Sequence, residues 1–179
     1  MKNSILIVFS ILIATITLAY SLYTVSWSDF PLSAEKIQKI TGIPVSDELI
    51  KVYTCSSTAE FTEISGSPYW VLASYKEKRI YLQPASLIPN ITRTISHELS
   101  HSYFKQFKFP YWIEEGLVCI ITGEWRGKSL DKLDKIEQVE ISDLDFYTYN
   151  NYSYTCWIEV SKIINENGFD FLLKKYGVK

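Results

Sequence analysis

The sequence predicts an α+β fold, in which a small β-sheet precedes a group of helices. Residues 49–55 and 69–82 alternate apolar and polar side chains over short runs, and the charged residues 76–78 supply a turn that makes the second run a β-hairpin. Further along the chain, apolar residues recur every four positions and form one stripe of a helix: Ile91, Ile95, Leu99 and Tyr103.

The chain begins with an apolar segment. Residues 1–28 contain one charged side chain, Lys2, and residues 5–20 are nearly continuously apolar. A segment of this kind is either a signal peptide or a signal-anchor transmembrane helix. In both cases the folded domain, which we place at residues 29–179, lies outside the cytoplasm. It is anchored to the membrane if the segment is retained, and it is secreted or periplasmic if the segment is removed.

Two features of this segment favour different outcomes. Small residues at Ala19 and Ser21 favour cleavage by a signal peptidase. The apolar stretch approaches the length that spans a bilayer, and it is flanked by aromatic residues of the kind found at membrane interfaces, namely Tyr20, Tyr23 and Trp27. These features favour an uncleaved anchor, which we expect. A helix of a soluble domain would show a polar face, and this segment has none.

The remaining elements follow in order along the chain. Residues 33–40 predict a short amphipathic helix that ends at Gly42. Residues 126–145 are rich in charge and predict a loop with a short helical turn. Two further helices are expected, at 152–164 and at 169–176.

The helix with the apolar stripe carries the sequence His97-Glu98-Leu99-Ser100-His101, and its two histidines are the only two in the chain. Residues four apart lie on the same face of a helix, about 5–6 Å apart, which suits two imidazole nitrogens that bind one zinc ion. Glu98 follows His97 directly, so it lies beside the metal and is placed to act as a general base. A five-residue pattern also arises by chance, so the surrounding sequence has to show whether the two histidines form a metal site.

Two histidines do not complete a catalytic zinc site, which usually has three protein ligands. The chain has no third histidine, so the third ligand has to be a carboxylate or a cysteine. Pro110 marks a turn, and the apolar helix expected after it contains two acidic residues near its start, Glu114 and Glu115. A carboxylate in an apolar segment is costly unless a cation compensates its charge, which zinc would do.

Together, these two motifs resemble the gluzincin metallopeptidases, and most closely the bacterial group with a peptidase MA-like domain. The resemblance rests on residues 97–101 and on residues 110–117, Pro-Tyr-Trp-Ile-Glu-Glu-Gly-Leu. It covers the second half of the chain well and the first half loosely. It implies a zincin-like domain whose third zinc ligand is the Glu before the Gly, here Glu115, with Glu114 as the alternative. Otherwise Glu114 is expected to be solvated at the helix start, where the helix dipole favours acidic residues.

The resemblance implies three further features. In relatives one sheet edge runs beside the metal cleft and pairs with extended substrate, which indicates Tyr69–Ala73 here. A tyrosine of a later helix often faces the metal, and Tyr154 is the first candidate to stabilise an oxyanion, with Tyr152 as the alternative. An acidic residue often stands four positions after the ligand Glu, where this chain has Cys119. In this chain, a carboxylate that orients a zinc ligand therefore has to come from another position, or it is absent.

Composition narrows the functional classes. Of the 179 residues, 47% are hydrophobic, which is enough for one domain with a core, and the net charge of −2 without a basic run gives no indication of nucleic-acid binding. The three cysteines form no Cys-x-x-Cys motif, so a cysteine zinc site is not expected. A disulfide between Cys55 and Cys156 would be compatible with an exported chain, and Cys119 fits a buried small residue.

These observations predict a zinc-dependent metallopeptidase, in which His97, His101 and Glu115 hold Zn²⁺ and Glu98 is the general base. Its partner is a peptide or protein substrate, and the sequence does not indicate an oligomeric state. The alternative is a zinc-binding scaffold of the same fold that turns over no substrate, because of the missing carboxylate at Cys119 and the small size of the domain.

Overall fold

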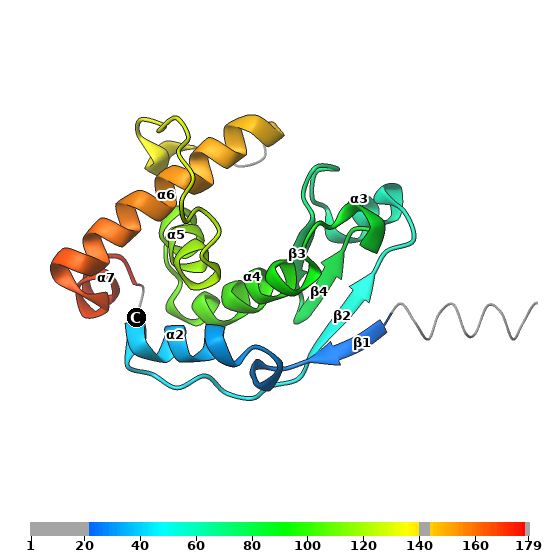
Figure 1. Ribbon diagram of the computed structural model, residues 1–179, viewed down its shortest axis with the longest axis horizontal. Helices are drawn as coiled ribbons and strands as arrows, with labels where there is room; N and C mark the ends of the chain where they lie inside the picture. The colour runs from blue at the N-terminus through cyan, green and yellow to red at the C-terminus, as the bar shows by residue number, and fades with distance from the viewer. Residues whose placement is uncertain (1–21, 140–143, 178–179) are drawn as a thin grey trace, which may run out of the picture.

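The computed structural model describes residues 22–139 and 144–177. Within these ranges the chain forms an α+β domain with a four-stranded sheet and six α-helices, so the predicted fold class is confirmed (Figure 1). The strands are β1 (Leu22–Val25), β2 (Ile50–Thr54), β3 (Ala73–Lys76) and β4 (Arg79–Leu82). The α-helices are α2 (Pro31–Thr41), α3 (Thr58–Ser65), α4 (Ile91–Phe104), α5 (Tyr111–Thr122), α6 (Phe146–Asn167) and α7 (Phe169–Tyr176). Short 3-10 helices are η1 (Trp27–Asp29), η2 (Ala85–Leu87), η3 (Lys105–Phe107) and η4 (Ile136–Gln138).

The sheet has the strand order β1-β2-β4-β3, so β1 and β3 are its edges. β2 pairs in parallel with β4, and α3 lies in the connection between them. β3 pairs antiparallel with β4 through a turn at Glu77 and Lys78, whose positive φ angles of 52° and 60° suit the twist of a tight hairpin. The predicted hairpin is therefore confirmed, and its β3 edge packs beside α4.

Helix α4 lies at the centre of the domain. Figure 1 shows it between the sheet on one side and α5 with α6 on the other, with α2 below it in this view. Ile95, Leu99 and Tyr103 are buried and join the main hydrophobic core, as the sequence predicts. Ile91, in the first turn, is 38% exposed, so the buried stripe starts one turn later than expected. The side chain of Asn90 caps the helix.

Helices α5 and α6 approach each other closely at Gly116. A Cβ added there would stand 2.5 Å from the backbone oxygen of Cys156 and 2.5 Å from Cγ2 of Val160, both on α6. Nonbonded carbon atoms normally stand about 3.5–4.0 Å apart, so only glycine fits without movement of a helix. Because Glu115 precedes this contact directly, the close approach also brings α6 against Glu115.

The folded domain begins before residue 29. Strand β1 pairs with β2, and Trp27 of η1 is buried and packs edge-on against Tyr103. Residues 22–28 therefore belong to the folded domain, and Trp27 is a core residue. The rest of the N-terminal apolar segment, residues 1–21, lies outside the described residues. Among the helices that the structure describes, none is long and apolar enough to cross a membrane.

Several local expectations differ from the structure. Residues 58–65, for which no element was predicted, form α3. Helix α6 begins at Phe146 instead of residue 152. Only Ala73 of the expected substrate-pairing segment Tyr69–Ala73 belongs to a strand, and the edge beside α4 is β3 itself. All three cysteines are free and buried, so the Cys55–Cys156 disulfide does not form.

Candidate metal centre

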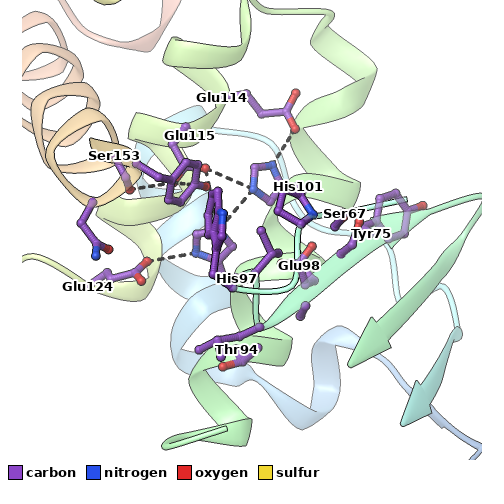
Figure 2. A pocket seen from close by; sticks show the side chains of 18 of the residues that line it. Ser67, Tyr75, Thr94, His97, Glu98, His101, Glu114, Glu115, Glu124 and Ser153 are labelled. Carbon is purple, nitrogen blue, oxygen red and sulfur yellow. Dashed lines mark hydrogen bonds and ion pairs between the residues drawn. The ribbon is translucent and has the colours of Figure 1, made fainter. Parts of the chain in front are cut away.

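The two histidines of α4 point to the same side of the helix. Because α4 runs unbroken from Ile91 to Phe104, His97 and His101 stand one turn apart on one face. Their Nε2 atoms lie 3.2 Å from each other and the two rings meet edge-on. Figure 2 shows the two side chains side by side. The helix therefore presents two imidazole nitrogens to one point in space.

Glu115 of α5 is the third member of this group. Its Oε2 lies 3.4 Å from Nε2 of His101 and 3.8 Å from Nε2 of His97, and its side chain is completely buried. The candidate ligand atoms of the three residues all lie within 4.8 Å of one another. In the described part of the chain, no other group of three His, Cys, Asp or Glu residues converges in this way. The three residues that the sequence assigns to a metal thus come together.

Each histidine has a second carboxylate behind it. Nδ1 of His101 lies 2.7 Å from Oε1 of Glu114, and Nδ1 of His97 lies 3.1 Å from Oε2 of Glu124 (Figure 2). Because an ionised carboxylate only accepts hydrogen bonds, Nδ1 donates in both pairs. An imidazole that donates from Nδ1 offers the lone pair of Nε2 to a metal, and the carboxylate fixes the orientation of the ring.

The sequence predicts that Glu114 is solvated at the start of α5, but the structure buries it against His101. It is 9% exposed, because the first turn of α5 packs against α4 beside His101. Its negative charge faces the imidazole ring, so the charge is compensated within the site and not by water.

Glu124 supplies a carboxylate that the position of Cys119 lacks. Helix α5 ends at Thr122, and the φ of 65° at the C-cap Gly123 turns the chain so that the next residue, Glu124, reaches back to His97. Oε2 of Glu124 lies 3.8 Å from Sγ of Cys119, so the carboxylate lies next to the short thiol side chain. The carboxylate behind His97 therefore comes from beyond the end of the helix and not from position 119.

Hydroxyl groups hold the carboxylate of Glu115. Its Oε1 accepts hydrogen bonds from Oγ of Ser153 at 2.7 Å and from the hydroxyl of Tyr149 at 3.2 Å, both on α6. Burial alone would raise the pKa of Glu115, but His101, His97 and the bond from Ser153 hold it well below its usual range. The buried carboxylate is therefore ionised.

The pKa values of the two histidines shift in the opposite direction, upward. Burial alone would lower the pKa of His101, but the hydrogen bonds to Glu114 and Glu115 outweigh it and raise the pKa to about 10. Burial also opposes protonation of His97, whose pKa is raised by Glu124 and Glu115. Carboxylates outnumber imidazoles in this site, so it attracts cations, and a metal ion at the two Nε2 atoms would take the place of protons.

Glu98 lies beside these residues without joining their group. Its side chain is 8% exposed and lines a cavity that His97, His101 and Glu115 also line. Burial raises the pKa of Glu98, and the charges of His101 and His97 and the backbone N–H of Tyr75 oppose this only in part. A carboxyl group with a raised pKa exchanges a proton closer to neutral pH, which suits Glu98 to proton transfer.

A cavity of about 400 Å³ opens onto these side chains. One wall is formed by residues of the segment 67–75, which ends in β3, and the other by residues of α4, α5 and α6. Figure 2 shows Ser67 and Tyr75 on the sheet side, opposite Glu115 and Ser153 on the helical side. A molecule in this cavity would contact both walls and the histidine pair.

Tyr154, the candidate from the sequence, does not line this cavity. It is buried in a separate cluster with Cys119 and Trp125, and its ring packs edge-on against Trp125. The alternative, Tyr152, is 1% exposed and stacks on the ring of Tyr111. Neither tyrosine therefore offers its hydroxyl to the cavity.

The tyrosine of α6 that reaches the site is Tyr149, which the sequence analysis missed together with Ser153 and Glu124. Tyr149 and Ser153 stand four residues apart and so share a face of α6. The four-residue spacing could have indicated this shared face. It was missed because the helix was expected to start at residue 152, between Tyr149 and Ser153.

The described residues thus bring together three side chains that can bind one metal ion, two carboxylates that orient the histidines, and a buried carboxylate beside them. Comparisons with known protein families, with curated proteins and with solved structures found no match. The function has to be inferred from the geometry and chemistry of the site itself.

Proposed function

We propose that this chain is a zinc-dependent metallopeptidase with His97, His101 and Glu115 as zinc ligands and Glu98 as general base. The observation that carries the proposal is the convergence of three ligand atoms at a cavity that Glu98 also lines. The proposal includes the zincin-like fold and the gluzincin type of site, which the two sequence motifs resemble.

The donor set fits zinc. Two imidazole nitrogens and one carboxylate are a common ligand set for catalytic zinc, with a fourth position left for water or substrate. Tetrahedral ligands about 2.0–2.1 Å from a zinc ion stand about 3.3–3.5 Å apart. The three separations here, 3.2, 3.4 and 3.8 Å, are close to that value. Calcium and magnesium prefer oxygen ligands, which makes them a poor match for two imidazoles.

Zinc in such a site polarises the substrate carbonyl and makes water more acidic. The carboxylate of Glu98 takes the proton from the attacking water and then gives it to the nitrogen of the departing amine. Adjacent residues of a helix are rotated by about 100°, so Glu98 lies beside the ligand His97 without competing for the metal. Its burial keeps the transferred proton from bulk solvent.

Two other groups assist in this proposal. The hydroxyl of Tyr149 lines the cavity and lies 3.3 Å from the hydroxyl of Tyr111. We assign to Tyr149, in place of Tyr154, the hydrogen bond that stabilises negative charge on the carbonyl oxygen. For this bond its single O–H turns from Oε1 of Glu115 to the substrate, while Ser153 keeps its bond to Glu115. Strand β3 is a sheet edge at the same cavity, where an extended peptide can add as a further strand.

The alternative of a zinc-binding scaffold rests mainly on the carboxylate missing at Cys119. Because Glu124 places a carboxylate against His97, this reason no longer separates the two functions. Turnover does separate them, since a scaffold binds zinc and cleaves nothing.

The test is a Glu98→Gln variant of the full-length chain, assayed on a peptide library together with the wild-type chain. Glutamine keeps the size and hydrogen bonding of Glu98 and removes its basicity. We expect the wild-type chain to cleave library peptides, and the variant to be slower by about 10²–10⁴-fold or more with its zinc content unchanged. The exposed Glu63→Gln on α3 is the control and should cleave normally. Cleavage by Glu98→Gln at the wild-type rate would refute the mechanism.

A further inference from the structure

We propose that the cavity selects substrates with a large apolar or aromatic side chain next to the bond that is cut. The surface that receives it is formed by Trp70, Phe146 and Tyr149, which we call the aromatic wall. This inference rests on the proposed function and concerns which peptides the site accepts.

The aromatic wall joins the two sides of the cavity. Trp70 belongs to the segment before β3, whereas Phe146 and Tyr149 belong to the first turn of α6. The ring centroid of Trp70 lies 5.1 Å from that of Tyr149 and 6.4 Å from that of Phe146, and all three residues line the cavity. Rings at these distances form one continuous apolar surface.

The wall also lies close to the proposed zinc ligands. The hydroxyl of Tyr149 donates to Oε1 of Glu115 at 3.2 Å, so a single side chain separates the ligand group from Trp70. A peptide whose scissile carbonyl lies at the histidine pair has its neighbouring side chains within a few ångströms of that carbonyl. One of these side chains therefore reaches the aromatic wall.

The chemistry around the wall indicates an uncharged occupant. Residues 67–72 and residues 146–153, the two segments that carry the wall, contain no Asp, Glu, Lys or Arg. The charged residues of the cavity lie elsewhere, at Arg93 on α4, at Lys105 on η3 and around the ligand group. A charged substrate side chain at the wall would lose water without gaining an ionic partner, which is costly.

A buried glutamine holds the wall in place. Gln83 is 1% exposed, and its Nε2 donates to the backbone oxygens of Tyr69 at 2.9 Å and of Val71 at 3.1 Å. Its own backbone N–H donates to the oxygen of Leu72 at 2.9 Å. These bonds fix the backbone on both sides of Trp70. Gln83 is therefore a positioning residue for the aromatic wall.

The test measures binding and not turnover. The probes are the hydroxamates of L-phenylalanine, L-alanine and L-lysine, which share one zinc-binding group and differ only in the side chain. The protein is the full-length, zinc-loaded Glu98→Gln chain, and affinities are measured by calorimetry. We expect the phenylalanine probe to bind at least about tenfold more tightly than the alanine probe, from burial of its ring. The lysine probe should bind no more tightly than the alanine probe.

Variants of the wall locate the effect. Trp70→Ala should reduce the advantage of the phenylalanine probe to below about threefold and leave the alanine probe unchanged. The neighbouring Tyr69→Ala is the matched control, because this side chain is 74% exposed and does not line the cavity. Gln83→Met removes the two Nε2 bonds at similar volume and should also reduce the advantage. A purely structural role of Gln83 would lower the affinity for all three probes equally.

The outcomes separate this inference from the proposed function. If no probe binds although zinc is present, the proposed centre is wrong and the inference falls with it. If the three probes bind equally, or if Trp70→Ala keeps the full advantage of phenylalanine, the aromatic wall is refuted while the zinc centre stands. Tighter binding of the lysine probe than of the phenylalanine probe would likewise refute the apolar preference. It would indicate that the wall holds a cation over its aromatic rings. The ranking on the chain with an intact wall decides the question even if a wall variant fails to fold.

Discussion

The two walls of the cavity differ in what they contribute. The helical wall carries every group of the proposed zinc centre, including the ligands, the carboxylates behind the histidines and the hydroxyls on Glu115. The sheet wall contributes an edge strand and apolar side chains, from residues 67–75. Glu115 is fully buried, whereas Leu72 on the sheet wall is 38% exposed. Metal binding is thus confined to the helical wall, whereas substrate selection also uses Trp70 of the sheet wall, and a mutation of the sheet wall should affect selection without affecting metal binding.

The largest effect on the helical wall is expected from Gly116→Ala. The added methyl group cannot fit between α5 and α6, so the helices must separate and Glu115 must shift. Overpacking costs about 1–3 kcal/mol, and the contact with a backbone oxygen places this site at the upper end of that range, so that about 2 kcal/mol is lost after the gain of roughly 1 kcal/mol from replacing a helical glycine. We expect the Tm to fall by about 4–8 °C in thermal unfolding. An unchanged Tm would show that the helix contact is less tight than described.

Within the helical wall, the two carboxylates behind the histidines should differ. Glu114 lies 2.7 Å from His101 with a side chain 11% exposed, whereas Glu124 lies 3.1 Å from His97 with a side chain 32% exposed. Glu114→Ala should weaken zinc affinity by about 10–100-fold, and Glu124→Ala should weaken it less because water screens that pair more. Competition with a chelator of known affinity measures both. A larger loss for Glu124→Ala would reverse this ranking.

The smallest effect on zinc is expected from the sheet wall. Trp70→Ala should leave the zinc affinity of the full-length chain within about twofold, because Trp70 contacts the ligand group only through Tyr149. The same chelator competition measures this. A large loss of zinc would mean that the two walls are not independent.

Part of the ligand group could be predicted from the sequence because its geometry is local. The spacing of His97 and His101 fixes their common face on any regular helix, whereas Glu115 was assigned through the resemblance to the gluzincins. The N-terminal boundary of the folded domain was harder to predict from the sequence. Residues 22–28 continue an apolar segment, so the pattern of the short strand β1 was hidden in it.

The residues that surround the proposed ligands could not be predicted from the sequence in the same way. Tyr149, Ser153 and Glu124 reach the site through the packing of α6 on α5 and through a turn after Gly123, which are tertiary features. The candidate Tyr154 lies outside the cavity for the same reason. It follows Ser153 by one residue, so it points about 100° away from the face that meets Glu115.

Metal analysis of the purified full-length chain shows whether His97, His101 and Glu115 together hold one zinc ion. We expect about one zinc per chain for the wild type, because one ligand set exists in the described residues. We expect loss of stoichiometric zinc in Glu115→Ala and retention of it in the exposed control Glu63→Ala. A wild-type chain that takes up no zinc, or a Glu115→Ala chain that keeps one zinc per chain, would contradict this expectation.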